Sequence, residues 1–418
     1  MNDLSRQQEY LLLGLDVGST TVKAAVVKPD EPKPLFVRYR RHHAEQMHAM
    51  RLLLEEVREA FPQAAFRIAV CGSGGKPIAD CTGIHFVQEV VANASAVRHL
   101  YPQTRTAIEL GGQDAKIIFF QYDENAGQLV ARDMRMNGSC AGGTGAFIDE
   151  IASLLKVPVE EFDELAAHGT TVYEISGRCG VYAKTDIQPL LNQGASKADL
   201  ALSAFHAIAK QTLGGLAQGL DVAPPVIFEG GPLTFNPTLV RVFCERLRLS
   251  DDQTIRPEHP ETIVALGTAL ALDELFAQED ASIDFERLGE LLGEDAQLGA
   301  DHEAVAPLFV SAEELDAFRA RHASAPEPPR TAAARDGKLR VYLGIDSGST
   351  TTKFALIDED ENLVDYHYAP NEGAPLDVAR TALINLREHY REEGVEIEIL
   401  ACGTTGYGEN LFGRAFHA

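Results

Sequence analysis

The pattern of apolar and polar positions predicts strands and helices in alternation. Apolar runs that close in glycine turns predict buried strands at 11–27, 66–72, 106–120 and 224–232. Longer stretches with apolar residues at helical spacing predict helices at 46–61, 146–155 and 261–272. Strands separated by helices are typical of α/β folds, in which ligands bind where the strands end.

One strand–turn–strand pattern occurs twice along the chain. LLLGLDVGSTTVKAAVVK at 11–28 is matched by VYLGIDSGSTTTKFALID at 341–358, and IAVCGSGGKP at 68–77 is similar to ILACGTTGYG at 399–408. A repeat over this distance indicates a duplicated domain.

The repeat divides the chain into three predicted parts. We expect a complete domain at 10–277, an acidic helical segment with a Pro/Ala-rich linker at 278–339, and an incomplete second domain at 340–418. The second copy has no counterpart of the later glycine motifs. We therefore expect a fragment of a longer protein, with a vestigial second domain as the alternative.

Composition and charge exclude some classes of function. The formal net charge of −25 argues against nucleic acid and anionic lipid, which require a basic surface, and we attribute it to solubility. No apolar run reaches the ~20 residues that span a membrane, and the first residues lack a signal pattern. The six cysteines are scattered rather than dense, so we expect a reducing cytoplasm.

The motif that starts at Asp16 has the features of a phosphate-binding hairpin. Gly18 permits a tight turn whose N–H groups face one point, and Asp16 is placed to hold Mg²⁺ through water. Three hydroxyl groups are candidates to donate to phosphate oxygens: Ser19, Thr20 and Thr21. A plain β-hairpin is the alternative, which the second occurrence at 344–351 makes less favoured.

Two further glycine turns extend the site. Gly111 and Gly112 form a second phosphate turn that we expect to face the first, and Gln113 and Asp114 are candidates to orient water or a second Mg²⁺ contact. A third turn is expected to admit a flat base and ribose, through Gly230, Gly231, Pro232 and Asn236. Two lysines follow the phosphate turns, Lys23 and Lys116, and each is either a phosphate contact or a solvated strand-end residue.

The order of these three motifs resembles the two phosphate motifs and the adenosine motif of the actin, sugar-kinase and heat-shock-chaperone ATPase superfamily. The resemblance implies an α/β fold of two ribonuclease-H-like subdomains that clamp ATP between them. Closure of the subdomains would be the mechanical output.

Two cysteines lie in glycine-rich loops. Cys140, in SCAGGTG, precedes a predicted helix whose N-terminus stabilises a thiolate, and Cys179, in RCGVYAKTD, has cations nearby. Thiolates among backbone donors suit iron–sulfur ligation. A [4Fe–4S] cluster usually takes four thiolates, which two identical subunits with two cysteines each would supply.

The combination closely resembles the ATP-dependent activators of 2-hydroxyacyl-CoA dehydratases and the ATPase subunits of benzoyl-CoA reductase. The resemblance covers 11–272 and the start of a second copy after 341. It implies a homodimer bridged by a [4Fe–4S] cluster on Cys140 and Cys179. It also implies ATP with Mg²⁺, a donor such as ferredoxin or flavodoxin, and electron transfer to a partner dehydratase or reductase. One departure is Glu109, where that family often has Asp.

Other interpretations stay open. A small-molecule kinase would need a catalytic Asp outside the phosphate turns, for which no motif is present, and an ATP-gated interaction module would leave the cysteines incidental. We expect Cys71 and Cys402 to close equivalent strands as buried core thiols, and Cys81 and Cys244 to have no special role. The helix at 146–155 is expected to make core or dimer contacts rather than to bind a cofactor.

Overall fold

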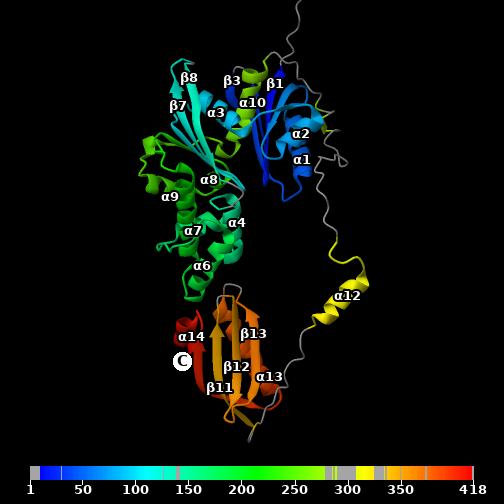
Figure 1. Cartoon of the computed structure of the whole chain (residues 1–418), viewed down its shortest axis with the longest axis vertical. Coiled ribbons are helices and arrows are strands. Elements are labelled where there is room, and N and C mark those ends of the chain that lie inside the picture. The colour runs from blue at the N-terminus through cyan, green and yellow to red at the C-terminus, as the bar shows by residue number, and fades with distance from the viewer. Residues whose placement is uncertain are drawn as a thin grey trace, which may run out of the picture. The chain divides into compact units, whose positions relative to one another are not determined.

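The computed structural model describes residues 10–29, 31–125, 127–137, 142–277, 285, 288–289, 307–323, 334, 337–348, 350–371 and 374–416. The chain divides into two compact units (Figure 1). The first unit comprises Met1–Ile187 and Ser196–Leu298, and the second comprises Gln188–Ala195 and Gly299–Ala418.

The first unit contains two five-stranded sheets with the same topology. Sheet one has the order β3-β2-β1-β4-β5, from β1 (Tyr10–Val17), β2 (Thr21–Lys28), β3 (Glu31–Arg41), β4 (Ala65–Cys71) and β5 (His85–Phe86). Sheet two has the order β10-β9-β6-β7-β8, from β6 (Thr106–Leu110), β7 (Ala115–Asp123), β8 (Gln128–Met136), β9 (Val226–Glu229) and β10 (Thr254–Ile255). In each sheet an antiparallel three-stranded meander is extended by strands parallel to its first strand. This repetition confirms the predicted α/β fold of two related subdomains.

Helices cover both faces of sheet one (Figure 1). One face packs on α1 (Gln46–Ala60) and α2 (Gly75–Thr82), and the other on α3 (Glu89–Leu100) and α10 (Ile263–Phe276). Residues Ile263–Leu272 of α10 are all buried, as expected of a helix that is apolar on every side. The predicted helices at 46–61 and 261–272 are therefore confirmed.

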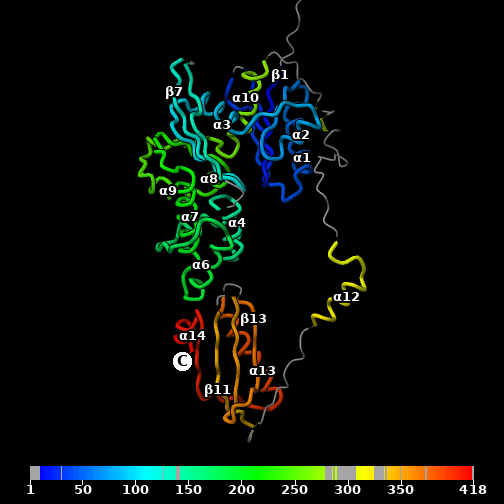
Figure 2. Tube along the Cα trace, in the orientation of Figure 1, coloured from blue at the N-terminus to red at the C-terminus, as the bar shows by residue number. Residues whose placement is uncertain are grey.

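The helices of the second subdomain lie along the chain between β8 and β9 and between β9 and β10, and are traced in Figure 2. They are α4 (Gly145–Leu155), α5 (Phe162–Ala167), α6 (Gly180–Asn192), α7 (Lys197–Thr212), α8 (Gly231–Phe235) and α9 (Pro237–Leu247), with a π-helical turn at Leu213–Ala217 and 3₁₀ turns at Val159–Glu161, Asp251–Gln253 and Pro260–Thr262. Among the described residues of the chain, no helix combines the length and apolar character needed to cross a membrane.

The second unit contains one four-stranded sheet with the order β13-β12-β11-β14. Its elements are α12 (Ala312–Arg321), β11 (Lys338–Ser347), β12 (Thr351–Asp358), β13 (Leu363–Pro370), α13 (Pro375–Glu392), β14 (Glu396–Thr405) and α14 (Glu409–Phe416). The meander β11–β12–β13 and the parallel strand β14 repeat the plan of sheet one. Most of the predicted linker lies outside the described residues.

The fourth strands of the two copies, β4 and β14, align differently in the structure from the predicted alignment. Cys71 lies opposite Asp16 at the end of β4, whereas Thr405 takes the corresponding place opposite Asp346. The expectation that Cys402 closes an equivalent strand is therefore wrong, because β14 has a bulge and extends three residues further. Cys71 is fully buried, which raises the pKa of its thiol, while Cys402 is only half-buried.

Candidate functional site

The first predicted phosphate turn is a tight hairpin between β1 and β2. The N–H of Gly18 donates to the carbonyl of Thr21 at 2.9 Å, and Lys23 forms an ion pair with Asp16 at 2.6 Å. Burial lowers the pKa of Lys23, but the adjacent Asp16 carboxylate raises it by more. The net pKa lies above the usual value, so the lysine stays charged. Lys23 is thus a half-buried, ion-paired cation in the site, with its side chain 15% exposed, and the alternative of a solvated lysine is wrong.

The second turn faces the first, as predicted. The N–H of Gly111 donates to the carbonyl of Asp114 at 2.8 Å. A Cβ at Gly112 would lie 1.9 Å from Oγ1 of Thr20, so only glycine fits where the two turns meet. The N-terminus of α4 closes over this turn, because Gly145 and Ala146 donate to the carbonyls of Gly111 and Gly112 at 2.9 and 2.8 Å.

Lys116 does not have either of its predicted roles. Its side chain is 3% exposed, so it is not solvated, and it does not line the pocket between the turns. It lies 2.7 Å from Glu89 and 3.4 Å from Glu109, and it also contacts Asp114. Burial lowers the pKa of Lys116, but these three carboxylates hold it well above the usual value. Lys116 therefore neutralises a buried acidic cluster behind the second turn.

Glu109 and Glu229 form a buried carboxylate pair on neighbouring strands. They are register partners on β6 and β9, and burial raises the pKa of Glu109 to about 7 and that of Glu229 to about 8. Asn93 of α3 donates to Oε2 of Glu229 at 2.5 Å. Oε2 of Glu109 and Oε1 of Glu229 are buried and have no hydrogen-bond partner within the part of the chain that the structure describes. The pair therefore favours protonated forms near neutral pH.

The third turn places glycine backbone against two neighbouring elements. Gly230 has a φ of +90°, and a Cβ there would lie 2.1 Å from the carbonyl oxygen of Leu110. A Cβ at Gly231 would lie 2.8 Å from the hydroxyl of Tyr39. Asn236 donates to the carbonyl of Pro232 at 2.8 Å, which closes the short helix α8. Gly230 is therefore required by its φ and by the close backbone of Leu110, whereas Gly231 leaves room for the side chain of Tyr39.

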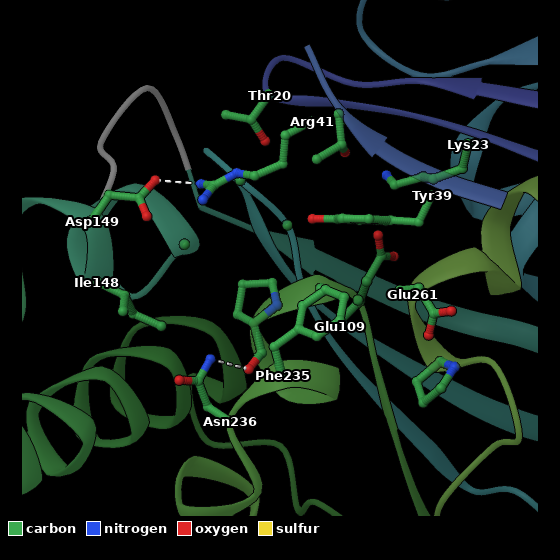
Figure 3. A pocket seen from close by; sticks show the side chains of 18 of the residues that line it. Thr20, Lys23, Tyr39, Arg41, Glu109, Ile148, Asp149, Phe235, Asn236 and Glu261 are labelled. Carbon is green, nitrogen blue, oxygen red and sulfur yellow. Dashed lines mark hydrogen bonds and ion pairs between the residues drawn. The ribbon is translucent and has the colours of Figure 1, made fainter. Parts of the chain in front are cut away.

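One pocket joins the three turns (Figure 3). Its lining includes ten of the predicted residues: Asp16, Thr20, Thr21, Lys23, Gly111, Gly112, Gly230, Gly231, Pro232 and Asn236. Five other predicted residues are outside the lining: Gly18 and Ser19 of the first turn, Gln113 and Asp114 of the second, and Lys116. Hydroxyls, glycine backbone and a lysine at one part of a pocket suit phosphates, and apolar side chains at another suit a flat base.

Sequence reasoning missed several lining residues because it did not predict β3. Tyr39 and Arg41 reach the pocket from β3, and the ring of Tyr39 lies 5.3 Å from that of Phe235. The apolar side of α4 is buried, as expected for core contacts, and Ile148 and Asp149 of the same helix also line the pocket. The alternation of apolar or aromatic residues with arginines at 37–40 was the signal that could have revealed the strand.

The structure describes one of the two candidate cluster ligands. Cys140 lies outside the described residues. Cys179 is half-buried directly before α6, and its carbonyl accepts from the N–H of Ala183 at 2.9 Å. Cys179 thus lies at the position directly before a helix N-terminus. Cys81 is exposed and Cys244 is half-buried beside Thr254, as expected for residues without a motif.

The loops that carry the two cysteines are in contact. A Cβ at Gly142 would lie 2.0 Å from the carbonyl oxygen of Arg178, so the backbone after Cys140 packs on the backbone before Cys179. The N–H of Ser176 donates to Asp186 at 2.8 Å, which anchors the second loop to α6. Among the described residues, no three His, Cys, Asp or Glu side chains are grouped to hold a metal by themselves. Two thiolates on adjoining glycine-rich loops fit a cluster that is completed by another subunit.

Comparisons with known proteins agree with this geometry. The model of the BadF/BadG/BcrA/BcrD ATPase family matches residues 13–271. The chain is 31% identical over 189 residues to the 2-hydroxyisocaproyl-CoA dehydratase activator of Clostridioides difficile, covering 45% of this chain and 67% of that protein. It is 28% identical over 221 residues to the (R)-2-hydroxyglutaryl-CoA dehydratase activating ATPase of Acidaminococcus fermentans, covering 52% of this chain and 82% of that protein.

A solved structure supports the fold. The activator of the 2-hydroxyisocaproyl-CoA dehydratase from Clostridium difficile, with bound ADPNP, superposes with a TM-score of 0.54 and 25% sequence identity. The match covers 67% of this chain and 96% of that one. The predicted resemblance to the activator family is therefore confirmed.

Proposed function

The chain belongs to the BadF/BadG/BcrA/BcrD ATPase family, and from this premise we propose that it is an ATP-dependent one-electron donor to a partner iron–sulfur enzyme. The partner is a 2-hydroxyacyl-CoA dehydratase or a related reductase. The chain works as a homodimer in a reducing cytoplasm, and ferredoxin or flavodoxin supplies the electron.

ATP is proposed to bind in the pocket between the two subdomains. Thr20 and Thr21 donate to phosphate from the first turn, with Lys23 beside them, and the backbone of Gly111 and Gly112 approaches from the second turn. Asp16, which lines the pocket, would hold Mg²⁺ beside the phosphates, and Gln113 with Asp114 would orient the attacking water from just outside the lining. Gly230, Gly231, Pro232 and Asn236 hold the adenosine.

Cys140 and Cys179 of each subunit are proposed to hold one [4Fe–4S] cluster. Such a cluster would supply a one-electron carrier of low potential. The observation that carries this proposal is the contact of Gly142 with Arg178, because it brings the two cysteine loops together. The first of these loops leads into α4, whose N-terminus is hydrogen-bonded to the second phosphate turn. A change at the second phosphate turn can therefore reach Cys140 through these two hydrogen bonds and the short stretch of chain before α4.

Anaerobic purification of the whole chain tests the proposal. We expect a brown protein with about four irons per dimer, and loss of iron and colour in Cys140→Ser and in Cys179→Ser. The matched controls are Cys81→Ser and Cys244→Ser, which should keep both. A colourless, iron-free protein that transfers phosphate from ATP to a metabolite would instead establish the kinase alternative.

A further inference from the structure

Strand β3 divides its side chains between two partners. Arg38 and Arg40 both pair with Glu56 of α1, on the outer side of sheet one. Tyr39 and Arg41 alternate with them and line the pocket. Arg41 lies opposite Thr21 in the ladder between β2 and β3, which places it beside the first phosphate turn. Successive residues of a strand point to opposite faces, so this division follows directly from the strand.

Arg41 joins the two subdomains across the pocket. Its Nη2 lies 2.5 Å from Oδ2 of Asp149 on α4, as Figure 3 shows. The two side chains are 35% and 39% exposed, so the pair borders open space in the pocket. Because α4 is bonded to the second turn through Gly145 and Ala146, this ion pair ties the helix to the first subdomain as well.

The chemistry of the pair favours its exchange for phosphate. A guanidinium binds phosphate through two parallel hydrogen bonds, and a nucleoside triphosphate offers several anionic oxygens where Asp149 offers one carboxylate. An ion pair that is about one third exposed is weak and is readily given up.

We propose that Arg41 is a ligand of the nucleotide phosphates, and that it leaves Asp149 when the nucleotide binds. Asp149 is then a competitor for Arg41 before the nucleotide binds. The exchange releases α4, and the cysteine loop before it, from sheet one. This inference rests on the proposed function only in taking ATP as the ligand.

Titration of MgATP into the whole chain and its variants tests the exchange. We expect Asp149→Asn to bind ATP about two- to fivefold more tightly, because the competitor is removed and a weak pair is lost. Arg41→Gln should bind about tenfold or more weakly, since a charged hydrogen-bonding group is lost. Combining Arg41→Gln with Asp149→Asn should leave affinity as weak as Arg41→Gln alone, because the gain acts through Arg41.

The matched control is Arg38→Gln on the same strand, which should bind ATP as the unmodified chain does. Unchanged affinity in Arg41→Gln would overturn the proposal, and so would weaker binding in Asp149→Asn, which would make Asp149 a support for Arg41. Failure of the unmodified chain to bind ATP would contradict the proposed function itself. Unfolding midpoints of the four variants, compared with that of the unmodified chain, identify any variant that does not fold.

Discussion

At the scale of single residues, the buried pair Glu109 and Glu229 determines how the first unit responds to pH. Burial raises the pKa of Glu109 to about 7 and of Glu229 to about 8, against an ordinary value near 4.3 in an unfolded chain. Between these values the native state binds more protons than the unfolded state. Its free energy of unfolding therefore falls as the pH rises through that window.

Glu229→Gln should reduce this dependence. The amide oxygen of glutamine keeps an acceptor for Asn93 but has no proton to lose in this range. We expect the free energy of unfolding from pH 5 to pH 9 to fall less in the variant than in the unmodified chain, by on the order of 2 kcal/mol. Urea denaturation at a series of pH values measures it. Exposed Glu59→Gln is the control, and an identical slope in Glu229→Gln would show that Glu229 does not titrate in the window.

At the scale of elements, the two copies differ in what covers the first strand. A Cβ at Gly14 of β1 would lie 2.0 Å from the carbonyl oxygen of Ala265 on α10, so the helix packs directly on the glycine. Gly344 is its counterpart on β11, and a Cβ there would meet nothing within 4 Å. The same glycine therefore occurs in both motifs, but among the described residues a helix packs on it only in the first copy.

Gly14→Ala and Gly344→Ala form a matched pair. Gly14→Ala should destabilise the first unit by about 1–3 kcal/mol, because α10 must shift to admit the methyl group. Gly344→Ala should leave the second unit unchanged, or stabilise it by about 0.5–1 kcal/mol through the lost flexibility of glycine. Hydrogen exchange in urea follows each unit separately. Equal destabilisation by both changes would show that the contact of Gly14 with α10 does not determine the cost of the added methyl group.

At the scale of the whole first unit, the pocket and the cysteine loops are linked through α4. The helix contacts the second turn at its N-terminus and Arg41 through Asp149, and the loop before it packs on the loop of Cys179. A substitution at the cysteine end of this path should therefore change the proposed iron binding and leave the proposed ATP binding unchanged.

Gly142→Ala tests that separation. The added methyl group would lie too close to the carbonyl of Arg178, so the loops must move apart. We expect iron affinity in anaerobic reconstitution to fall about tenfold or more, as for other residues that orient metal ligands, with ATP affinity retained. Gly214→Ala, where a Cβ meets nothing within 4 Å, should change neither. Full iron binding in Gly142→Ala would show that this contact does not position the cysteines.

The sequence by itself determined the features that depend on neighbouring residues. Apolar periodicity predicted the strands and helices around the three turns, and glycines with hydroxyls predicted which turns admit phosphate, because these properties are set within a few residues of chain. The contact between Gly112 and Thr20 agrees with that prediction. Recognition of the cysteine motifs depended likewise on short stretches of sequence.

Only the tertiary structure decided which distant segments meet. Strand β3 brings Arg41 to Asp149, sheet two places Glu109 beside Glu229, and Lys116 is buried among carboxylates although its sequence equally suits a solvated strand end. The register between β11 and β14 placed Thr405, not Cys402, opposite Asp346. Burial and charge pairing depend on the packing of elements far apart in the chain, which local periodicity does not specify.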